Sequence, residues 1–516
     1  FKTIIMMKSK MLYLAIFTLI SLYSQAQNLQ EAYNFSSSEL NGTARYTAMG
    51  GAFGALGGDI SALKDNPAGS AIFLNNYLSG TLSVETYTND LSIENNFSSS
   101  RDNDLDVSQI GAVFVFNNYN KKAFINKFAL GFTYDKTKSL ENFYTWSGNT
   151  NNSLANFFVD QAQGIPLGEL ESAGGMLYQN YDRLFYADFS NENFTNAQAQ
   201  TAYMGYQNFL INPANNDVEN TNYVSNVNGS SYDQEYDYMS TGFNGKFTGN
   251  ASLAIKNKLH LGLNLNGHII NYERNTAFYE NVNTSNTIAS SYYEHSNLTL
   301  GRGFSLDVGA IYRLSNTVRI GANYSSPTWY TIHDETSHFL RNTGDVATLG
   351  AESIVFDPQI INVYPEYNYR TPGKLSGSLA LVFGKTGIIS FEYTYKDYSA
   401  IEYSSDDYNF NNLNSTIENS FTSTSSLKVG GEYRIKRWSA RAGYQYTETP
   451  YIDESVVGNL NTYSLGLGYN LGDMKIDISY FRSNQDARQS LYQTSFNNAY
   501  NERTLSNIAA TFSVNL

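Results

Sequence analysis

Residues 34–73 read NFSSSELNGTARYTAMGGAFGALGGDISALKDNPAGSAIF, and seven of these forty residues are glycines. Glycine lets one backbone approach another closely, but it weakens a free-standing helix or the interior of a strand. The stretch ends in the turn signal Asn66–Gly69, in which proline fixes one φ angle and glycine relaxes another. We therefore predict a compact coil threaded through a narrow space, a plug around which the rest of the chain forms a barrel.

Beyond the plug, the chain alternates between apolar and small or polar residues. Residues 259–269 read LHLGLNLNGHI, which places leucines on one face of a strand and His, Gly and Asn on the other. The same alternation recurs in residues 124–135, 438–445 and 462–471. One apolar face toward lipid and one polar face toward a lumen is the pattern of a transmembrane β-barrel.

Fourteen segments of this kind follow the plug, and an even number is typical of a single-chain bacterial barrel. They start near Tyr77, Asp106, Phe124, Glu235, Leu259, Tyr292, Thr317, Tyr364, Gly387, Phe421, Trp438, Asn459, Met474 and Thr504. Tight turns such as 256–258 alternate with long loops such as 91–105 and 276–290, as at the periplasmic and extracellular rims. We predict an all-β fold: a 14-stranded antiparallel transmembrane β-barrel with an N-terminal hatch or plug inside the lumen and a partly helical extracellular loop.

The longest connection, residues 138–233, is too long for an unstructured loop in a compact protein. Within it, residues 152–163 and 167–177 have helical spacing, so we expect a helical cap over the outer mouth. The last strand, Thr504–Leu516, alternates up to its final residue. Such a strand is expected to pair with the first one and to close the sheet.

The first 26 residues have the pattern of a signal peptide. Lys8 and Lys10 precede the apolar run 11–22, and the small residues of Ser24–Ala26 supply the cleavage positions. The apolar run is too short for a membrane anchor. We therefore expect three parts: 1–26 signal peptide, 27–75 hatch (plug) and 76–516 barrel, with the long extracellular insertion at about 138–233.

Composition narrows the classes of partner and chemistry. The formal net charge of −14, without a basic cluster in the sequence, argues against nucleic acid. The chain has no cysteine, which excludes disulfides, thiolate metal sites and a lipidated cysteine. The acidic run Asp102–Asp106 lacks the glycine and the glutamate of a calcium loop, so we interpret it as a solvated loop tip and expect no metal. No catalytic motif is present, and we expect neither an enzyme nor a cofactor.

Several charged residues are expected to face the lumen, among them Lys428 and Arg441. Each could meet a ligand carboxylate, or each could pair with a neighbouring carboxylate of the barrel. The sequence leaves both interpretations open.

The signal peptide, the wording AMGGAFGALGGD and DNPAG, and the fourteen strands together resemble the FadL/TodX-type outer-membrane transporters of hydrophobic compounds, in particular Bacteroidetes-type members. The specific motifs lie within residues 36–72. The resemblance implies a hatch and ligand region formed by Gly50, Gly51, Gly54, Asn66, Pro67, Ala68 and Gly69. It also implies a lateral opening at the third strand, where Gly131 is the candidate for a kink; the alternative is a lumen position kept small for the plug.

The resemblance further implies a monomer in the cell outer membrane that takes up hydrophobic small molecules, either long-chain fatty acids or aromatic hydrocarbons, and releases them sideways. Its expected partners are that ligand and outer-membrane lipid. Burying one methylene is worth about 0.8 kcal/mol, so a water-filled pore offers such cargo nothing. Three alternatives stay open: an outer-membrane component of a protein secretion system, a general diffusion porin, and a purely structural barrel.

Overall fold

The computed structural model describes residues 29–516 with the exception of 94–95, 121–122, 172–175, 190–191, 284–286, 346–349, 351, 408 and 491–497. The predicted signal peptide, residues 1–26, lies outside the described residues. Within the described residues, no helix is both long and apolar enough to cross a membrane.

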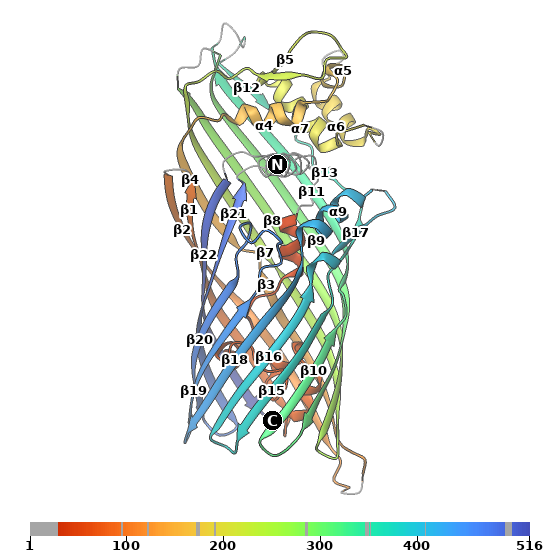
Figure 1. The fold of residues 1–516 in the computed structure, drawn as a ribbon, viewed down its shortest axis with the longest axis vertical. Helices are drawn as coiled ribbons and strands as arrows, with labels where there is room; N and C mark the ends of the chain where they lie inside the picture. The colour runs from red at the N-terminus through yellow and green to blue at the C-terminus, as the bar shows by residue number, and fades with distance from the viewer. Residues whose placement is uncertain are drawn as a thin grey trace, which may run out of the picture.

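The strands form one closed antiparallel barrel of fourteen strands (Figure 1). They are β1 (Tyr77–Ile93), β2 (Asn96–Asn117), β3 (Ile125–Ser139) continued by β4 (Asn142–Thr150), β7 (Ser231–Ile255), β8 (Leu259–Asn283), β9 (Ile288–Arg313), β10 (Val318–Ser325) continued by β11 (Trp329–Gly344), β14 (Tyr367–Arg370) continued by β15 (Lys374–Phe383), β16 (Gly387–Asp397) continued by β17 (Glu402–Ser404), β18 (Ser423–Ile435), β19 (Trp438–Thr447), β20 (Leu460–Asn470), β21 (Met474–Ser490) and β22 (Asn498–Asn515). The last strand pairs with the first from Tyr77↔Asn515 to Ser92↔Tyr500, which closes the sheet. This confirms the predicted fold class.

The two faces of the barrel wall differ as the alternation predicted. On β8, Leu263 and Leu265 are 43% and 52% exposed on the outside, whereas Asn264 and Asn266 are 0% and 1% exposed toward the lumen. A closed barrel has no open first or last edge, and its apolar exterior can face lipid. The barrel is therefore built to cross a membrane.

Two connections that the sequence predicted as long loops are strands instead. Strands β1 and β2 pair up to Ile93↔Asn96, so the predicted loop 91–105 is mostly sheet. Strands β8 and β9 likewise extend into the predicted loop 276–290, since β8 ends at Asn283 and β9 begins at Ile288. The prediction was wrong because it required an apolar residue at every second position, which a strand needs only where it faces lipid. The acidic run Asp102–Asp106, predicted as a loop tip, lies within β2 for the same reason.

The cap, residues 151–230, lies over the end of the barrel where the strands are longest (Figure 1). It contains α4 (Leu154–Ala162), α5 (Leu167–Leu170), α6 (Leu177–Tyr186), α7 (Asn196–Gln207), β5 (Ile211–Pro213) and β6 (Tyr223–Ser225); nearer the wall lie β12 (Ser353–Phe356), β13 (Asn362–Val363), η4 (Tyr398–Ala400) and α9 (Asn411–Ser420). Helix α4 matches the predicted helix 152–163. Of the predicted helix 167–177, α5 and the first residue of α6 are helical, and residues 172–175 lie outside the described residues. Helix α7 was not predicted. Phe157 and Phe158 of α4 pack on Tyr293 of β9, which joins cap and wall in one apolar core.

The plug, residues 29–73, lies inside the barrel (Figure 1, red). It contains α2 (Leu29–Ser36), α3 (Ala44–Ala48), η1 (Ile60–Lys64) and η2 (Pro67–Ile72). Its backbone binds side chains on opposite sides of the wall, and the partners are Thr511 of β22, Ser464 of β20, Glu392 of β16 and Asn264 of β8. This position is the one that the glycine-rich sequence predicted.

Candidate functional site

Asn66 holds the end of the plug to the wall. Its side-chain oxygen accepts a hydrogen bond from the Ala68 amide (3.1 Å) and caps η2, with Pro67 at the first helical position. Its amide nitrogen donates to the carbonyl of Gly54 at 2.8 Å and lies 3.1 Å from that of Ala310 in β9. One side chain thus joins the turn, the glycine-rich loop and the barrel. The motif packs chiefly on β7, β8 and β9, with β3 also in contact.

The candidate glycines of the plug serve close approach. Gly50 has φ +60°, and a Cβ on it would lie 3.0 Å from the backbone nitrogen of Tyr444 in β19. Gly54 donates its amide to Glu392 of β16 at 2.9 Å. Gly51 has φ +73°, where a side chain would be strained. The structure thus gives these residues a packing role, and their contact with a ligand stays a prediction.

Three glycines of the wall complete this fit, and the sequence reasoning missed them. A Cβ on Gly262 of β8 would overlap the backbone of Pro67, and one on Gly309 of β9 would overlap the side chain of Asn66. Gly443 of β19 makes the same room for Gly50. All three stand on the lumen face of an alternating strand, and glycine at such a position was the signal that could have identified them.

Gly131 does not interrupt the sheet. It pairs with Val113 of β2 and with Asn250 of β7, and neither ladder shifts at this residue. A Cβ on Gly131 would come within 2.8 Å of the Leu63 side chain in the plug. The expected kink is thus corrected in favour of the alternative, a lumen position kept small for the plug. Whether the wall opens here during transport stays untested.

Lys428 and Arg441 are both paired. The Lys428 ammonium lies 2.9 Å from Glu392, and Arg441 contacts Glu432 at 2.7 Å and Asp477 at 2.6 Å. Glu432 also contacts Arg45 of the plug at 2.9 Å. These side chains therefore tie the plug to the wall, which favours the pairing interpretation over recognition of a ligand carboxylate.

Four residues beyond Gly131, the wall has a seam, a stretch where two neighbouring strands are not joined by a backbone ladder. The β2–β3 ladder ends at Gln109↔Asp135, and in the described residues no ladder joins the remainder of β2 to β4. The β3–β7 register shifts between Lys136 and Lys138, so β3 bends away from β2 at this height. We call the segments 98–108 of β2 and 136–145 of β3–β4 the seam.

Side chains bridge the seam where backbone pairing is absent. The Lys136 ammonium crosses it to Asp106 at 2.9 Å and to Asp104 at 3.7 Å, and it also contacts the buried Glu85 at 2.9 Å. The Thr145 amide donates to the Ser100 hydroxyl at 3.1 Å. The polar run 135–138, with three charged residues among its four, interrupts the alternation of β3 and was the sequence signal for this break.

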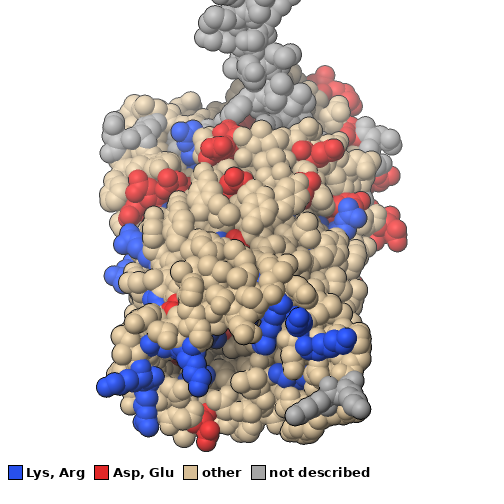
Figure 2. All heavy atoms as spheres, turned by 60° about the horizontal axis from the view of Figure 1, so that its bottom comes forward, with Lys and Arg blue, Asp and Glu red and all other residues tan. Residues whose placement is uncertain are grey.

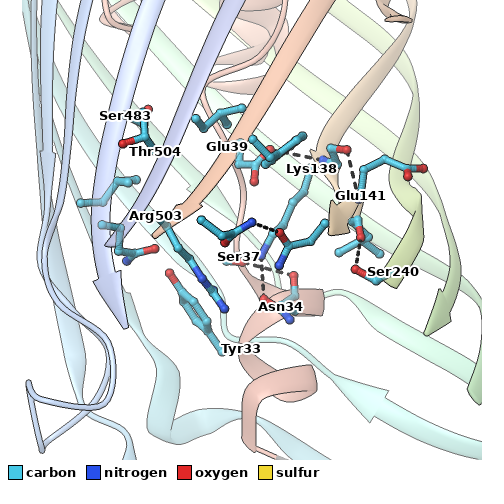
Figure 3. A pocket seen from close by; sticks show the side chains of 18 of the residues that line it. Tyr33, Asn34, Ser37, Glu39, Lys138, Glu141, Ser240, Ser483, Arg503 and Thr504 are labelled. Atoms are coloured by element: carbon cyan, nitrogen blue, oxygen red, sulfur yellow. Dashed lines mark hydrogen bonds between the residues drawn. The ribbon is translucent and has the colours of Figure 1, made fainter. Parts of the chain in front are cut away.

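A pocket of about 150 Å³ lies between the upper plug and the seam (Figure 3). Its lining includes residues 138–142 of β3–β4, residues 87–89 of β1 and residues 33–34 and 37–40 of the plug. Lys138 donates to Ser37 at 2.7 Å and to Asn34 at 3.0 Å, while Tyr33 and Arg503 line the facing side. The lining combines four tyrosine and four leucine side chains with a larger number of polar and charged ones, so it offers both apolar and hydrogen-bonding contacts.

Titratable side chains do not form a metal site in the part of the chain that the structure describes, where no three His, Asp or Glu residues cluster suitably. His260 and His268 both lie on the lumen side of β8 and do not contact each other. His268 contacts Ser305, and both ring nitrogens of His260 are buried without a hydrogen-bond partner among the described residues. The plug, the pocket and the seam therefore define the candidate site.

Comparison with known proteins supports the fold. No protein-family model and no curated protein matches the sequence. Among solved structures, the chain is similar to a FadL homologue of Pseudomonas aeruginosa, with a TM-score of 0.54, 12% identity and coverage of 93% of this chain and 99% of that one. It is also similar to the toluene transporter TodX of P. putida, with a TM-score of 0.52, 12% identity and the same coverage of both chains. The chain therefore has the FadL-type fold, a closed antiparallel β-barrel of fourteen strands.

Proposed function

We propose that this chain is an outer-membrane channel that takes up hydrophobic small molecules, which enter the pocket beside the upper plug and leave through the seam into the bilayer. The observation that carries this proposal is the pocket's position: it touches the one stretch of wall, within the described residues, where neighbouring strands lie side by side without a ladder. The structural likeness to a toluene transporter agrees with cargo of this kind.

The interior below the pocket favours exit to the side. The lower plug is fixed by Asn66 and by buried ion pairs. The plug packs directly against glycines of the wall there, and no room is left between them. A hydrocarbon chain gains about 0.8 kcal/mol for each methylene that leaves water, and a polar lumen does not provide that gain. At the lower end of the seam, Leu105 and Val107 are 70% and 41% exposed, so the exit opens where the outer surface of the wall becomes apolar.

A cross-link across the seam tests this path. The chain has no cysteine, so a Ser100→Cys/Thr145→Cys pair is the sole target for a short bis-maleimide. The matched control is Ser376→Cys/Thr394→Cys, a pair that faces the lumen on the laddered strands β15 and β16 with hydroxyls 3.0 Å apart. Uptake of a radiolabelled fatty acid or of toluene by cells should fall when the seam is cross-linked and should persist in the control. Equal uptake with a cross-linked seam would refute lateral exit.

A further inference from the structure

A cavity of about 410 Å³ opens below the plug, at the end of the barrel opposite the cap. Eight cationic side chains line it, and we call them the basic mouth: Arg45, Arg313, Arg319, Arg434, Lys436, Arg437, Arg441 and Lys475. Figure 2 shows Lys and Arg gathered toward this end and Asp and Glu toward the other. In a chain of net charge −14, this concentration of positive charge is not a consequence of composition.

Carboxylates of the protein neutralise only part of this positive charge. Arg45, Arg434 and Arg441 share Glu432, and Arg441 also contacts Asp477. The other five cations have no carboxylate oxygen within 4.0 Å among the described residues; they are Arg313, Arg319, Lys436, Arg437 and Lys475. Like charges that converge on one cavity without counter-charges repel each other, and an anionic ligand would relieve that repulsion.

Arg313 carries the clearest sign of a missing partner. Its Nε is buried and has no hydrogen-bond acceptor among the residues that the structure describes. Arg319 donates to the carbonyl of Leu56 in the plug at 3.0 Å, which fixes one edge of its guanidinium. A buried donor without an acceptor is costly, and native proteins rarely leave one. Both arginines flank the β9–β10 turn, and Lys436 and Arg437 stand on the β18–β19 turn of the same cavity.

The charge and size of the cavity indicate the class of ligand. Guanidinium groups bind phosphate and carboxylate in a fork, and a cavity of this volume accommodates a small molecule. A phosphate group carries a charge of roughly −1.5 to −2 near neutral pH, so about three phosphates match five cations. We propose that the basic mouth is a binding site for an oligophosphate, either soluble or carried by lipid headgroups. The proposal is independent of the cargo path.

An anion in this cavity would also bear on the plug. Arg45 belongs to the plug and reaches Glu432 of β18, the carboxylate that Arg434 and Arg441 share. A bound phosphate competes with Glu432 for these guanidinium groups. Occupancy of the mouth thereby links the periplasmic side of the barrel to the contact between plug and wall.

Calorimetric titration of the full chain in nonionic detergent with inorganic tripolyphosphate tests the site. We expect saturable binding that weakens at least tenfold in Arg313→Gln/Arg437→Gln. The control is Arg302→Gln/Arg370→Gln, which removes the same charge from exposed pairs with Glu366 and Glu402 far from the cavity. The control should bind as the unaltered chain does. Absence of saturable binding, or equal weakening in both double variants, overturns the proposal.

A second arm separates the two sources of phosphate. The same titration is repeated in nanodiscs of phosphatidylcholine alone and with phosphatidylglycerol. Loss of tripolyphosphate binding only with phosphatidylglycerol assigns the mouth to lipid headgroups, and retained binding assigns it to a soluble oligophosphate. A change in gel migration between the unheated and the boiled sample shows that the barrel of each variant is folded.

Discussion

Lys136 provides the sharpest test of how the seam is held closed. Its side chain is 1% exposed and that of Glu85 is 2% exposed, and the two lie 2.9 Å apart. Asp104 and Asp106, on the other side of the seam, are 32% and 35% exposed. The lysine is therefore a buried cation that joins β3 to β1 and, across the unpaired segment, to β2. We expect Lys136→Met to loosen the seam selectively.

The magnitude follows from burial. Removing one partner of a buried ion pair costs about 3–5 kcal/mol, whereas partly exposed pairs are worth about 0–1 kcal/mol each. Glu85 also accepts hydrogen bonds from Tyr87 at 3.1 Å and from Asn507 at 3.3 Å, so it is not left entirely without partners. We therefore expect a loss near the lower figure, about 3 kcal/mol. At 1.4 kcal/mol for each factor of ten, local opening becomes roughly 100-fold more frequent.

Hydrogen exchange measured by mass spectrometry on the barrel in detergent reports this opening. Amides of residues 98–106 and 142–145 should exchange roughly 100-fold faster in Lys136→Met, on the conversion of 1.4 kcal/mol per decade. Lys136→Met/Glu85→Gln removes both charges and should recover most of the protection. Lys428→Met is the matched control, because it breaks a largely buried pair with Glu392, whose side chains are 13% and 1% exposed, on laddered strands. Unchanged exchange at the seam, or an increase spread evenly over the barrel, would refute the idea that Lys136 closes it.

Two further changes test the plug and the cap. Gly309→Ala places a methyl group against Asn66 and should cost about 1–3 kcal/mol by overpacking. It should displace the lower plug and so raise ion conductance in planar bilayers. Gly377→Ala, with no described atom within 4 Å of the added methyl, should have none of these effects. Burial raises the pKa of Glu280, which accepts hydrogen bonds from Ser153 and the Leu154 amide at the start of α4. A raised carboxyl pKa gives stability that is complete below the ordinary value and is lost as pH rises through the folded-state value, so the cap should resist proteolysis better at pH 4 than at pH 7. Glu280→Gln should remove that difference, and an unchanged pH dependence would contradict the assignment.

The barrel could be predicted from the sequence because lipid imposes a strict pattern. Wherever a strand faces the bilayer, as at Leu263 and Leu265, every second residue must be apolar, and this period is legible without a structure. The strands above the bilayer could not be delimited in this way. The described parts of 91–104 and 276–290 still pair, but water accepts any residue on their outer face, so the period disappears while the sheet continues.

The site was predictable only in its plug half. Glycine density and the Asn66–Gly69 turn are local features of the sequence, and they correctly indicated close backbone approach. The seam depends on residues distant in sequence, since Lys136 meets Glu85, Asp104 and Asp106 only when β1, β2 and β3 are side by side. Gly131 was the candidate for a break because glycine in a strand interior often marks a bend. The structure uses that glycine to admit Leu63.

The contacts of the plug indicate which part of it must stay still. Its lower half is fixed by Asn66, and the Ser70 hydroxyl of η2 meets the Ser252 hydroxyl of β7. Its upper half borders the pocket and the seam, where Ser37 contacts Lys138. Cargo that leaves through the seam passes only the upper half, so the lower half has no need to move.

A bis-maleimide link between Ser70→Cys and Ser252→Cys should therefore leave hydrophobic uptake unchanged. The same link also prevents the plug from withdrawing and opening an aqueous pore. Uptake that falls on cross-linking, and recovers when the maleimide is omitted, would show that cargo travels along the barrel axis past a moving plug. The seam would then be a structural irregularity of the wall, and the basic mouth would lie on the cargo path.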